Sequence, residues 1–551
     1  MLNGSRSLVA FAIGATALSA CSTIQPMPKV AETIMSDAAV TPPTGPNIIF
    51  VLTDDQRYDA IGALDPNIDT PNMDKMLNEG AHFQNAFVTT SLCSPSRATI
   101  LTGQYMHTHG VVDNNKVDVS HLEFFPERLQ AAGYQTAFIG KWHMGAHGDD
   151  PQPGFDYWVS FKGQGHYRPV TNGNQSWLNV NGARVPQTDY ITDELTEYAM
   201  NWLRTVDQDA PFMLYLSHKA VHADFIPAER HRDLYQDRLP DLPASGIDSA
   251  ENREGKPLWV HNQRNSWHGV DFPYHSDLDI REYRREYNRS LSAVDESLGS
   301  LIAWLEAEDL ADNTIIVLMG DNGFMFGEHG LIDKRNAYEE SMRVPLIMYA
   351  PSKIQPGLKI DEVVANLDIA PTMLEWAGLA APDHYEGRSM AALIEQGEDK
   401  TWRDTLFYEY FWEYDFPSTP TTFAIRTPTH KLIQYHGVWD LEELYHIVDD
   451  PNERVNLIDD PDSVETKIEL RKALFEGLQN VQGENLIRYT ERTSSGTVFR
   501  HEDRSKAAEF PERWLRPDGA PDRIQMFTPD SVEKVEKFGT ITDPKPRETQ
   551  D

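Results

Sequence analysis

Four short apolar runs, each followed by polar or charged residues, constrain the fold of this 551-residue chain more than any other feature. Each run is continuous rather than alternating, which is typical of a strand buried on both faces of a parallel sheet. Segments with helical spacing, such as 192–206 and 280–310, separate the runs. The alternation predicts an α/β fold with a large, mainly parallel sheet sandwiched by helices. The runs occupy residues 47–52, 135–140, 211–216 and 314–319.

Charged side chains come shortly after each predicted strand. Asp54 and Asp55 follow the first run, Lys141 the second, His222 the third and Asp321 the fourth. The carboxyl ends of parallel strands meet at one edge of the sheet, where ligands bind. Two adjacent carboxylates in such a cleft repel each other unless a cation lies between them. A solvated acidic turn is the ordinary alternative for this pair.

A candidate helix begins near Cys93. Ser94 is a suitable N-cap, Pro95 suits the first helical position and Gly103 can end the helix. Cys93 would then lie just before the helix N-terminus, where backbone N–H groups favour negative charge. Arg97 is about one turn further on and can point back to the same place. A buried cysteine beside a surface arginine is the plainer interpretation.

The longer pattern, Cys93-x-Pro-x-Arg followed by Leu-Thr-Gly, resembles the signature of type I, formylglycine-dependent sulfatases. This family belongs to the alkaline-phosphatase-like superfamily, and the resemblance covers roughly residues 46–460. In the family, a maturation enzyme oxidises the cysteine to formylglycine (3-oxoalanine). One hydroxyl of its hydrate attacks the sulfur of a sulfate ester, and the other then expels the sulfate. The resemblance implies a sulfuric ester hydrolase.

The resemblance also implies a metal site. Three carboxylates and an amide suit one Ca²⁺ per chain better than Zn²⁺, which prefers His or Cys. The cation would hold one formylglycine oxygen, at residue 93, and one sulfate oxygen. The matching ligands are Asp54, Asp55, Asp321 and Asn322, together with the modified Cys93.

Family likeness further assigns roles to basic residues. Lys141 and Lys334 match sulfate-binding lysines, and Arg97 would neutralise remaining charge on the sulfate. His143 matches a histidine that contacts the formylglycine diol. His222 matches the acid that protonates the leaving oxygen. Two further assignments follow: Asp321 would take a proton from the diol, and His218 is the weaker match for the acid.

The N-terminus reads as an export signal. Residues 1–21 combine a positive start, an apolar run of secretory length and a lipoprotein-like box ending at Cys21. An ordinary signal peptide or a membrane helix is the alternative, although the run is short for a span. Residues 22–45 read as a tether. We expect an exported protein, in the periplasm or at the cell surface, attached to the membrane only through a lipid on Cys21.

The rest of the chain divides into three predicted parts. Residues 46–382 would form the catalytic domain and 383–485 a smaller α+β subdomain with an antiparallel sheet. Residues 486–551 are charged and proline-bearing, which predicts an extended tail. Only Cys21 and Cys93 are cysteines, so a disulfide framework is excluded.

The composition of the chain limits the kinds of molecule that it is expected to bind. A net charge of −36 argues against nucleic acid and against an anionic membrane surface. An exported sulfatase would act on a sulfated oligo- or polysaccharide, either algal fragments or sugars of the N-acetylglucosamine 6-sulfate type. Side chains that would contact the sugar, or else pack within the protein, are Tyr167, Trp177, His384, Arg388, Tyr408, Trp412 and Tyr414.

Two other functions fit parts of the sequence. A phosphonate or phosphate ester hydrolase of the same superfamily can share the cysteine motif and much of the metal site, although Lys141 and Lys334 favour a sulfate monoester. A surface glycan-binding lipoprotein without catalysis is the alternative from another class. It is disfavoured because every expected catalytic position is filled.

Overall fold

The computed structural model describes residues 45–114, 118–144, 148–170, 175–243, 245, 253–262, 279–397, 399–413, 416, 418–436 and 440–480. The predicted signal peptide 1–21, nearly all of the tether 22–45 and the tail 486–551 lie outside the described residues, as does Tyr414. Within the described part of the chain, no helix combines the length and apolar character needed to cross a membrane.

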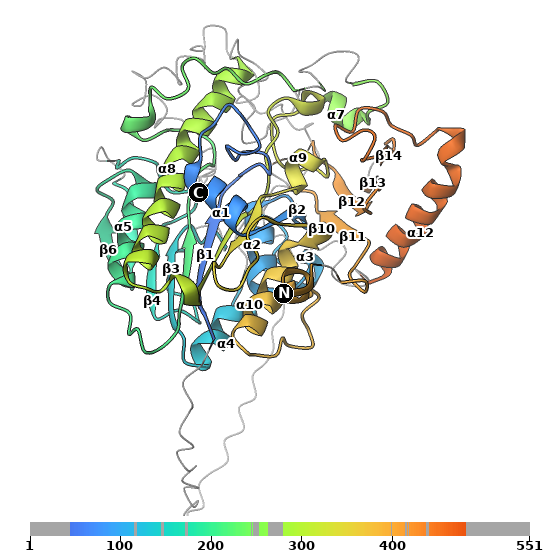
Figure 1. The fold of residues 1–551 in the computed structure, drawn as a ribbon. Coiled ribbons are helices and arrows are strands. Elements are labelled where there is room, and N and C mark those ends of the chain that lie inside the picture. The colour runs from blue at the N-terminus through green and yellow to red at the C-terminus, as the bar shows by residue number, and fades with distance from the viewer. Residues whose placement is uncertain are drawn as a thin grey trace, which may run out of the picture. The chain divides into compact units, whose positions relative to one another are not determined.

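A ten-stranded sheet organises the larger part of the fold (Figure 1). Its central strand, β1 (Asn47–Thr53), pairs in parallel with both neighbouring strands. A shift of one residue would turn every side chain of this strand to the opposite face of the sheet, and the two pairings together fix the register against such a shift. The strands, in spatial order, are β10 (Leu358–Ala365), β2 (Ala81–Phe87), β9 (Leu346–Tyr349), β8 (Thr314–Gly320), β1 (Asn47–Thr53), β7 (Phe212–Ser217), β3 (Gln135–Gly140), β4 (Tyr157–Ser160), β5 (Trp177–Val180) and β6 (Ala183–Pro186).

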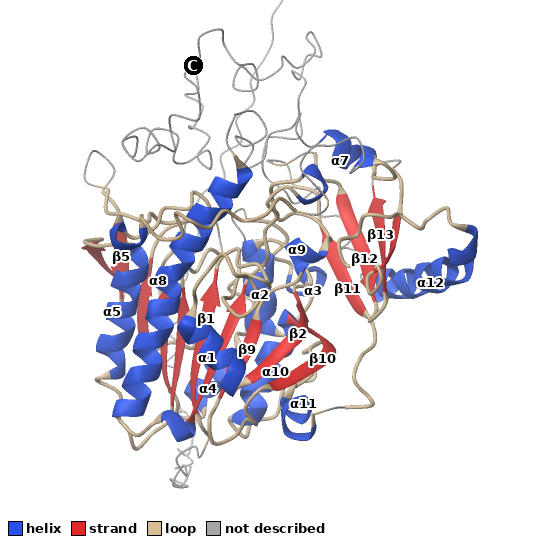
Figure 2. Cartoon of the chain, turned by 45° about the horizontal axis from the view of Figure 1, so that its top comes forward, coloured by secondary structure: helices blue, strands red, loops and turns tan. Residues whose placement is uncertain are grey.

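Helices cover both faces of this sheet (Figure 2). Ile48 and Phe50 of β1 belong to one apolar cluster, and Ile49 and Val51 belong to the other. Alternate residues therefore serve opposite layers, which is why the run is apolar throughout. The first layer contains α2 (Cys93–Thr102), α4 (Phe125–Ala131) and α10 (Ile369–Trp376). The second contains α1 (Pro71–Glu79), α5 (Ile191–Leu203) and α8 (Ile280–Ala307).

The register of the central strands brings their carboxyl ends to one edge. Leu52 of β1 pairs with Ser217 of β7 and with Met319 of β8. The next step pairs Thr53 with Gly320. The residues that follow these three strands therefore start from the same edge of the sheet, as the sequence predicted.

A second, four-stranded antiparallel sheet lies within residues 383–485. Helix α12 (Val464–Asn480) buries Leu470 and Leu474 in the same apolar cluster as Phe423 and Leu432 of this sheet. The predicted fold class is thus confirmed for both sheets. The strands are β11 (Leu406–Tyr410), β12 (Thr421–Arg426), β13 (His430–His436) and β14 (Glu443–His446).

Short helices complete the described chain. They are α3 (Met106–His109), α7 (Leu258–Asn262), α9 (Glu339–Met342) and α11 (Ala391–Gln396), with 3₁₀ turns η1 (Glu229–His231), η4 (Ala311–Asn313), η5 (Glu328–Gly330), η6 (Asn366–Asp368) and η7 (Pro461–Ser463).

The segment 146–190 contributes strands to the large sheet that no continuous apolar run predicts. Strands β4, β5 and β6 lie in it and extend the sheet at one side. Each of them has four residues, and β5 and β6 carry exposed side chains. Short edge strands with little burial leave no clear apolar pattern, so the sequence signal is weak.

Candidate active site

Cys93 is the first residue of helix α2 and is fully buried. The prediction that Ser94 caps this helix is wrong: the N-cap is Leu92, and no side chain caps the helix. The Ser94 hydroxyl instead donates to the carbonyl of His143, which ties α2 to the segment after β3. Gly103 ends the helix as predicted, at a φ of 64° that favours glycine, and its N–H donates to the Thr99 carbonyl at 2.9 Å.

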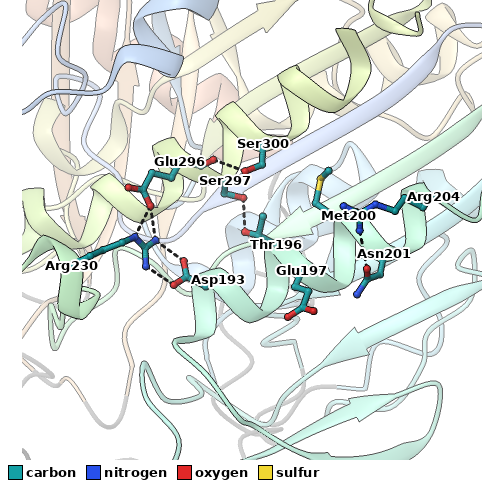
Figure 3. Close-up of a pocket in the computed structure, with 10 residues that line it drawn as sticks. All are labelled: Asp193, Thr196, Glu197, Met200, Asn201, Arg204, Arg230, Glu296, Ser297 and Ser300. Carbon is teal, nitrogen blue, oxygen red and sulfur yellow. Dashed lines mark hydrogen bonds and ion pairs between the residues drawn. The ribbon is translucent and has the colours of Figure 1, made fainter. Parts of the chain in front are cut away.

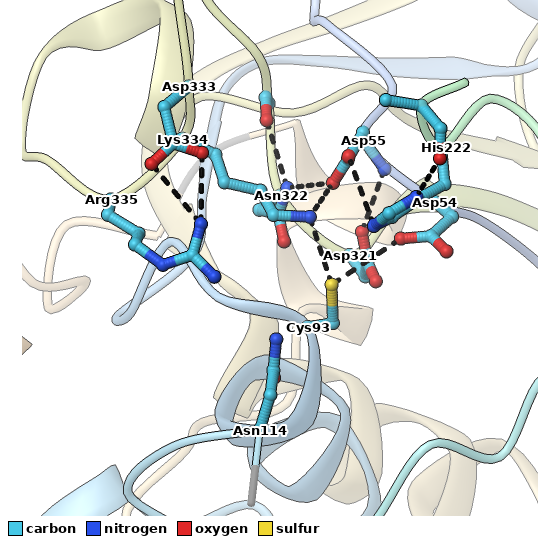
Figure 4. Close-up of polar contacts among 12 residues, drawn as sticks. Asp54, Asp55, Cys93, Asn114, His222, Asp321, Asn322, Asp333, Lys334 and Arg335 are labelled. Carbon is cyan, nitrogen blue, oxygen red and sulfur yellow. Dashed lines mark hydrogen bonds and ion pairs between the residues drawn. The ribbon is translucent and has the colours of Figure 1, made fainter. Parts of the chain in front are cut away.

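Three carboxylates gather beside Cys93 (Figure 4). One oxygen from each of Asp54, Asp55 and Asp321 lies within 4.8 Å of the others, and all three side chains are buried. The Asp55 N–H donates to Asp321 Oδ1 at 3.0 Å. Cys93 Sγ lies 3.6 Å from Asp54 Oδ1. The cysteine and the carboxylates therefore share one buried cluster.

Asn322 completes the set of oxygen ligands. Its Nδ2 donates to Asp55 Oδ1 at 2.6 Å, whereas its Oδ1 is buried without a hydrogen-bond partner. A buried amide oxygen without a partner is costly in a folded protein. Three crowded carboxylates and this amide oxygen form a donor set that suits a hard cation such as Ca²⁺.

Three cationic side chains oppose the carboxylates. Lys141 forms an ion pair with Asp54, and Lys334 forms one with Asp55. The Lys334 ammonium also lies 3.0 Å from Cys93 Sγ. All of these side chains are almost fully buried. The two lysines predicted to bind sulfate thus reach the cluster from different parts of the chain.

Arg97 points back toward the cluster, as the helical spacing predicted. Its Nε donates to Asp321 Oδ2 at 2.9 Å. Its Nη1 donates at 2.7 Å both to the carbonyl of Lys141 and to the hydroxyl of Ser217. The guanidinium therefore fixes Asp321 relative to the ends of β3 and β7.

Burial and neighbouring charges shift the protonation of this cluster. Burial and the negative charge of Asp54 raise the pKa of Asp321 to about 7. Burial also opposes the charge of Asp54, but Lys141 and His222 outweigh it and hold the pKa of Asp54 well below its ordinary value. A cation among these carboxylates would remove the repulsion that raises the pKa of Asp321. The electrostatics therefore fit a metal ion as well as the donor set does.

The unmodified cysteine is a poor nucleophile here. Burial raises the pKa of the Cys93 thiol to about 12, against the opposing effect of Lys141 and Lys334. Because the thiolate is the nucleophilic form, this shift disfavours an unmodified Cys93 as the nucleophile at neutral pH.

Of the two candidate acids, His222 is the one placed beside the carboxylates. Its Nε2 lies 3.9 Å from Asp55 Oδ2, and its Nδ1 lies 2.5 Å from the Ala223 carbonyl. The His222 side chain keeps 18% of its exposure, so it stands between the buried cluster and solvent. His218 is fully buried, and neither of its ring nitrogens has a hydrogen-bond partner within the described residues.

His143 lies at the edge of the same cluster. Burial and the nearby Lys141 lower the pKa of its imidazole well below the ordinary value. Its Nε2 lies 3.1 Å from the amide nitrogen of Gln164, whose segment follows β4. The neighbouring Trp142 packs against Phe138 in the apolar cluster instead.

Several residues considered for sugar binding are buried or lie outside the cluster. Tyr408 is fully buried, and its hydroxyl donates to the Asn336 carbonyl at 2.8 Å, so it packs within the protein. Tyr167 is also buried, and its hydroxyl donates to the His222 carbonyl at 2.7 Å. Trp177 is on the edge strand β5 and is 43% exposed. The Arg388 guanidinium donates to the Thr401 carbonyl.

A groove of about 390 Å³ lies along α5 and α8 (Figure 3). Its lining is polar, and Arg230 bridges Asp193 and Glu296 across one end. None of the predicted site residues lines this groove. It is separate from the cluster at the end of β1.

Sequence reasoning missed residues that support the cluster. Ser217 holds Arg97, and Asn114 accepts the N–H of Ser94 at 3.0 Å. Lys219 lies in the turn between β7 and His222, next to the site. The position of Ser217 and Lys219 directly after a predicted strand was the available signal, whereas nothing in the sequence marks Asn114.

Comparison with known proteins agrees with this geometry. The Sulfatase family model matches residues 46–379, and the model of the N-sulphoglucosamine sulphohydrolase C-terminal region matches residues 327–480. The N-acetylglucosamine-6-O-sulfatase of Bacteroides thetaiotaomicron is 35% identical over 458 residues, which cover 73% of this chain and 80% of that protein. The ulvan-active sulfatase of Formosa agariphila is 30% identical, covering 66% of this chain and 68% of that protein.

Solved structures show the same fold. The structure of BT4656 with its substrate D-glucosamine-2-N,6-O-disulfate has a TM-score of 0.70 and 31% identity, covering 79% of this chain and 98% of that chain. A phosphonate monoester hydrolase of Agrobacterium radiobacter shares the fold at a TM-score of 0.65 and 22% identity, covering 80% of this chain and 97% of that chain. The chain belongs to the sulfatase family and is a sulfuric ester hydrolase.

Proposed function

We propose that this enzyme hydrolyses the O-sulfate ester of a sulfated sugar, with 6-O-sulfated glucosamine as the substrate best supported. The observation that carries the proposal is the convergence of Cys93, three carboxylates and the cations Lys141 and Lys334 in one buried cluster. The likeness to an N-acetylglucosamine-6-O-sulfatase over four fifths of that protein supports the choice of sugar. Sulfated oligo- or polysaccharides from outside the cell are the natural source of such esters.

Cys93 would act after its oxidation to formylglycine. The hydrated aldehyde supplies a hydroxyl that attacks sulfur, so that the S–O bond to the sugar breaks. The buried thiol, with a pKa raised to about 12, supports a need for this modification because very little of it would be thiolate at neutral pH. Since Cys93 is fully buried in the folded chain, the maturation enzyme would act before folding is complete.

Asp54, Asp55, Asp321 and Asn322 would hold one Ca²⁺. Their oxygen donors and the unpartnered Oδ1 of Asn322 support a hard cation rather than Zn²⁺. When bound, the ion supplies positive charge that lowers the cost of bringing an anionic sulfate to a negative cluster.

The cationic side chains would bind the sulfate. Lys141 and Lys334 lie on either side of the carboxylate cluster and would neutralise the charge that builds on the sulfate oxygens in the transition state. Arg97 would add positive charge and keep Asp321 in place to accept a proton at its carboxylate. His143 would assist release of the sulfate from residue 93.

His222 would protonate the departing sugar oxygen. The contact of its Nδ1 with the Ala223 carbonyl leaves Nε2 directed at the site, where the carboxylates lie. Burial lowers the pKa of the free imidazole well below its ordinary value. An anionic sulfate bound beside the ring would raise that pKa and favour the protonated acid.

Export would place the enzyme where such sugars occur. The lipoprotein-like box ending at Cys21 supports a lipid anchor and a location in the periplasm or at the cell surface. Globomycin treatment of the native host should then leave an uncleaved precursor. A mature protein that starts after a different residue, without lipid, would contradict the anchor.

A direct comparison of esters tests the proposed reaction. Enzyme co-expressed with a formylglycine-generating enzyme should release sulfate from N-acetylglucosamine 6-sulfate, and should prefer an aryl sulfate to the matched aryl phosphonate. The Cys93→Ala variant should release nothing from any of these. Faster cleavage of the phosphonate ester would replace the proposal with a phosphonate hydrolase of the same superfamily.

A further inference from the structure

A third lysine lies beside the cluster and has no role in the proposed reaction. Lys219 is two residues beyond the end of β7 and is 4% exposed. Backbone hydrogen bonds join its turn to the metal-ligand segment, from the Asp54 N–H to the Ala220 carbonyl at 3.0 Å and from the Val221 N–H to the Asp54 carbonyl at 2.7 Å. The position of Lys219 relative to Asp54 is therefore fixed by the backbone.

The same turn carries His222, the proposed acid. The His222 N–H donates to the Lys219 carbonyl at 3.0 Å. Tyr167, whose hydroxyl donates to the His222 carbonyl, also presents its ring to the Lys219 ammonium at 4.5 Å. Tyr167 is itself buried and stacked on Tyr190. Tyr167 therefore contacts both Lys219 and the backbone of His222, and it helps to hold the two residues in place.

The Lys219 ammonium differs from the ammonium groups of Lys141 and Lys334 in its partners. Lys141 and Lys334 each form an ion pair with a carboxylate. Lys219 forms neither a hydrogen bond nor an ion pair with any described side chain; its ammonium lies over the ring of Tyr167, and Asp54 and Asp224 act on it through longer-range electrostatics. Burial lowers its pKa to about 8, so most of the ammonium remains charged at neutral pH.

A purely structural role does not explain this arrangement. A cation over an aromatic ring is a weak contact, and burying an ammonium without a carboxylate in direct contact is costly even when Asp54 and Asp224 are near. Partial burial, and after it the charge of Lys219, lowers the pKa of His166. The ammonium therefore lies within electrostatic reach of both the buried carboxylates of the cluster and His166.

We infer that Lys219 binds a second sulfo group of a disulfated sugar while the first sulfo group occupies the cluster at Cys93. The inference rests on the proposed function, because it is the sugar oxygen leaving at His222 that brings the rest of the substrate to this turn. An anion at Lys219 would supply the missing partner of its ammonium. The enzyme would then select sugars that carry two sulfo groups over sugars that carry one.

Two substrates that differ in the second sulfo group test this. They are D-glucosamine 2-N,6-O-disulfate and N-acetylglucosamine 6-sulfate, assayed for release of the 6-O-sulfate by matured enzyme. For Lys219→Met, the ratio of kcat/KM for the disulfate to that for the monosulfate should fall by roughly tenfold or more, because a buried charge pair is lost. The loss should lie in KM for the disulfate, and Lys219→Arg should restore part of it.

Lys162→Met provides the matched control, since Lys162 is exposed and forms no part of the site. Its ratio should equal that of the wild type. In a measurement that needs no variant, D-glucosamine 2-N-sulfate should inhibit the wild type more strongly than N-acetylglucosamine does.

Each other outcome overturns the inference. An equal fall on both substrates in Lys219→Met would place Lys219 at the reacting sulfate or in the fold, and an unchanged ratio would remove it from substrate binding. Equal inhibition by the two sugars without a 6-O-sulfate would do the same if the variant does not fold. Failure of the matured wild type to cleave either sulfated sugar would overturn the proposed function together with the inference.

Discussion

The ammonium of Lys334 lies 3.0 Å from the sulfur of Cys93, although the two residues are 241 positions apart in the chain. The same ammonium pairs with Asp55 at the end of β1. One side chain therefore joins the residue expected to become the nucleophile to the carboxylates expected to hold the metal. Of the contacts that Cys93 Sγ makes with the charged side chains around the proposed metal site, this one is the shortest.

Replacement of Lys334 by Met should reduce kcat/KM for a sulfated sugar by roughly 100-fold, because a charge aimed at the transition state is removed. In metal-free protein the thermal midpoint should also fall, since Asp55 would then remain buried without a cationic partner. Steady-state sulfate release and a melting curve measure the two effects. Lys353→Met, at an exposed lysine, is the control and should change neither. Activity within twofold of wild type in Lys334→Met would remove Lys334 from the site.

Removal of the metal should both inactivate and destabilise the enzyme. EGTA should lower the thermal midpoint because Asp54, Asp55 and Asp321 would repel one another once the ion is lost. Added Ca²⁺ should restore both properties. Asn322→Ala should weaken the apparent Ca²⁺ affinity by at least about tenfold while leaving the carboxylates in place. If EGTA removed all metal and still changed neither the melting curve nor the turnover rate, that result would rule out this ligand set.

The position of the candidate site at one edge of the sheet was predictable, because strand direction and register determine which residues meet there. Asp54, Lys141 and Asp321 each follow a continuous apolar run, and parallel pairing of β1 with β8 brings two of these ends together. The fold class needed no more than this alternation. The helical spacing between Cys93 and Arg97 likewise predicted that the guanidinium turns back, and it contacts Asp321.

Features that depend on tertiary contacts were not predictable. Serine is a common helix N-cap, but the hydroxyl of Ser94 donates to the carbonyl of His143 instead. Tyr408 was a candidate for sugar contact, yet the Asn336 carbonyl takes its hydroxyl inside the core. Lys219 follows a predicted strand, but nothing in the local sequence predicts that it is buried against Tyr167. In each case the partner lies more than 40 positions away, as with the 49 positions between Ser94 and His143.

The buried pair of His107 and Glu409 should make stability depend on pH. His107 Nδ1 lies 2.9 Å from Glu409 Oε2, and this contact joins α3 to β11 of the smaller sheet. Burial disfavours the charged imidazole, but the hydrogen bond and charge of Glu409 outweigh it and raise the pKa of His107 above its ordinary value. The raised pKa means that the pair stabilises the fold fully below about pH 6.5 and loses this contribution as pH rises through the folded-state pKa.

The measurement is a comparison of the wild type with His107→Gln. The difference between their thermal midpoints should be larger at pH 5.5 than at pH 8.5, because only the charged imidazole gains from Glu409. A difference that stays constant across this range, or that grows toward high pH, would show that His107 remains neutral in the folded protein.

The central claim is that residue 93 supplies the reacting group only after its oxidation, within the cluster that binds the metal. Mass spectrometry of the peptide that contains residue 93, combined with turnover on the same samples, tests it most directly. Across preparations with different levels of the maturation enzyme, the sulfate release rate should rise in proportion to the fraction of the aldehyde form and reach zero without it. Full turnover in a preparation that retains only the Cys93 thiol would contradict the account.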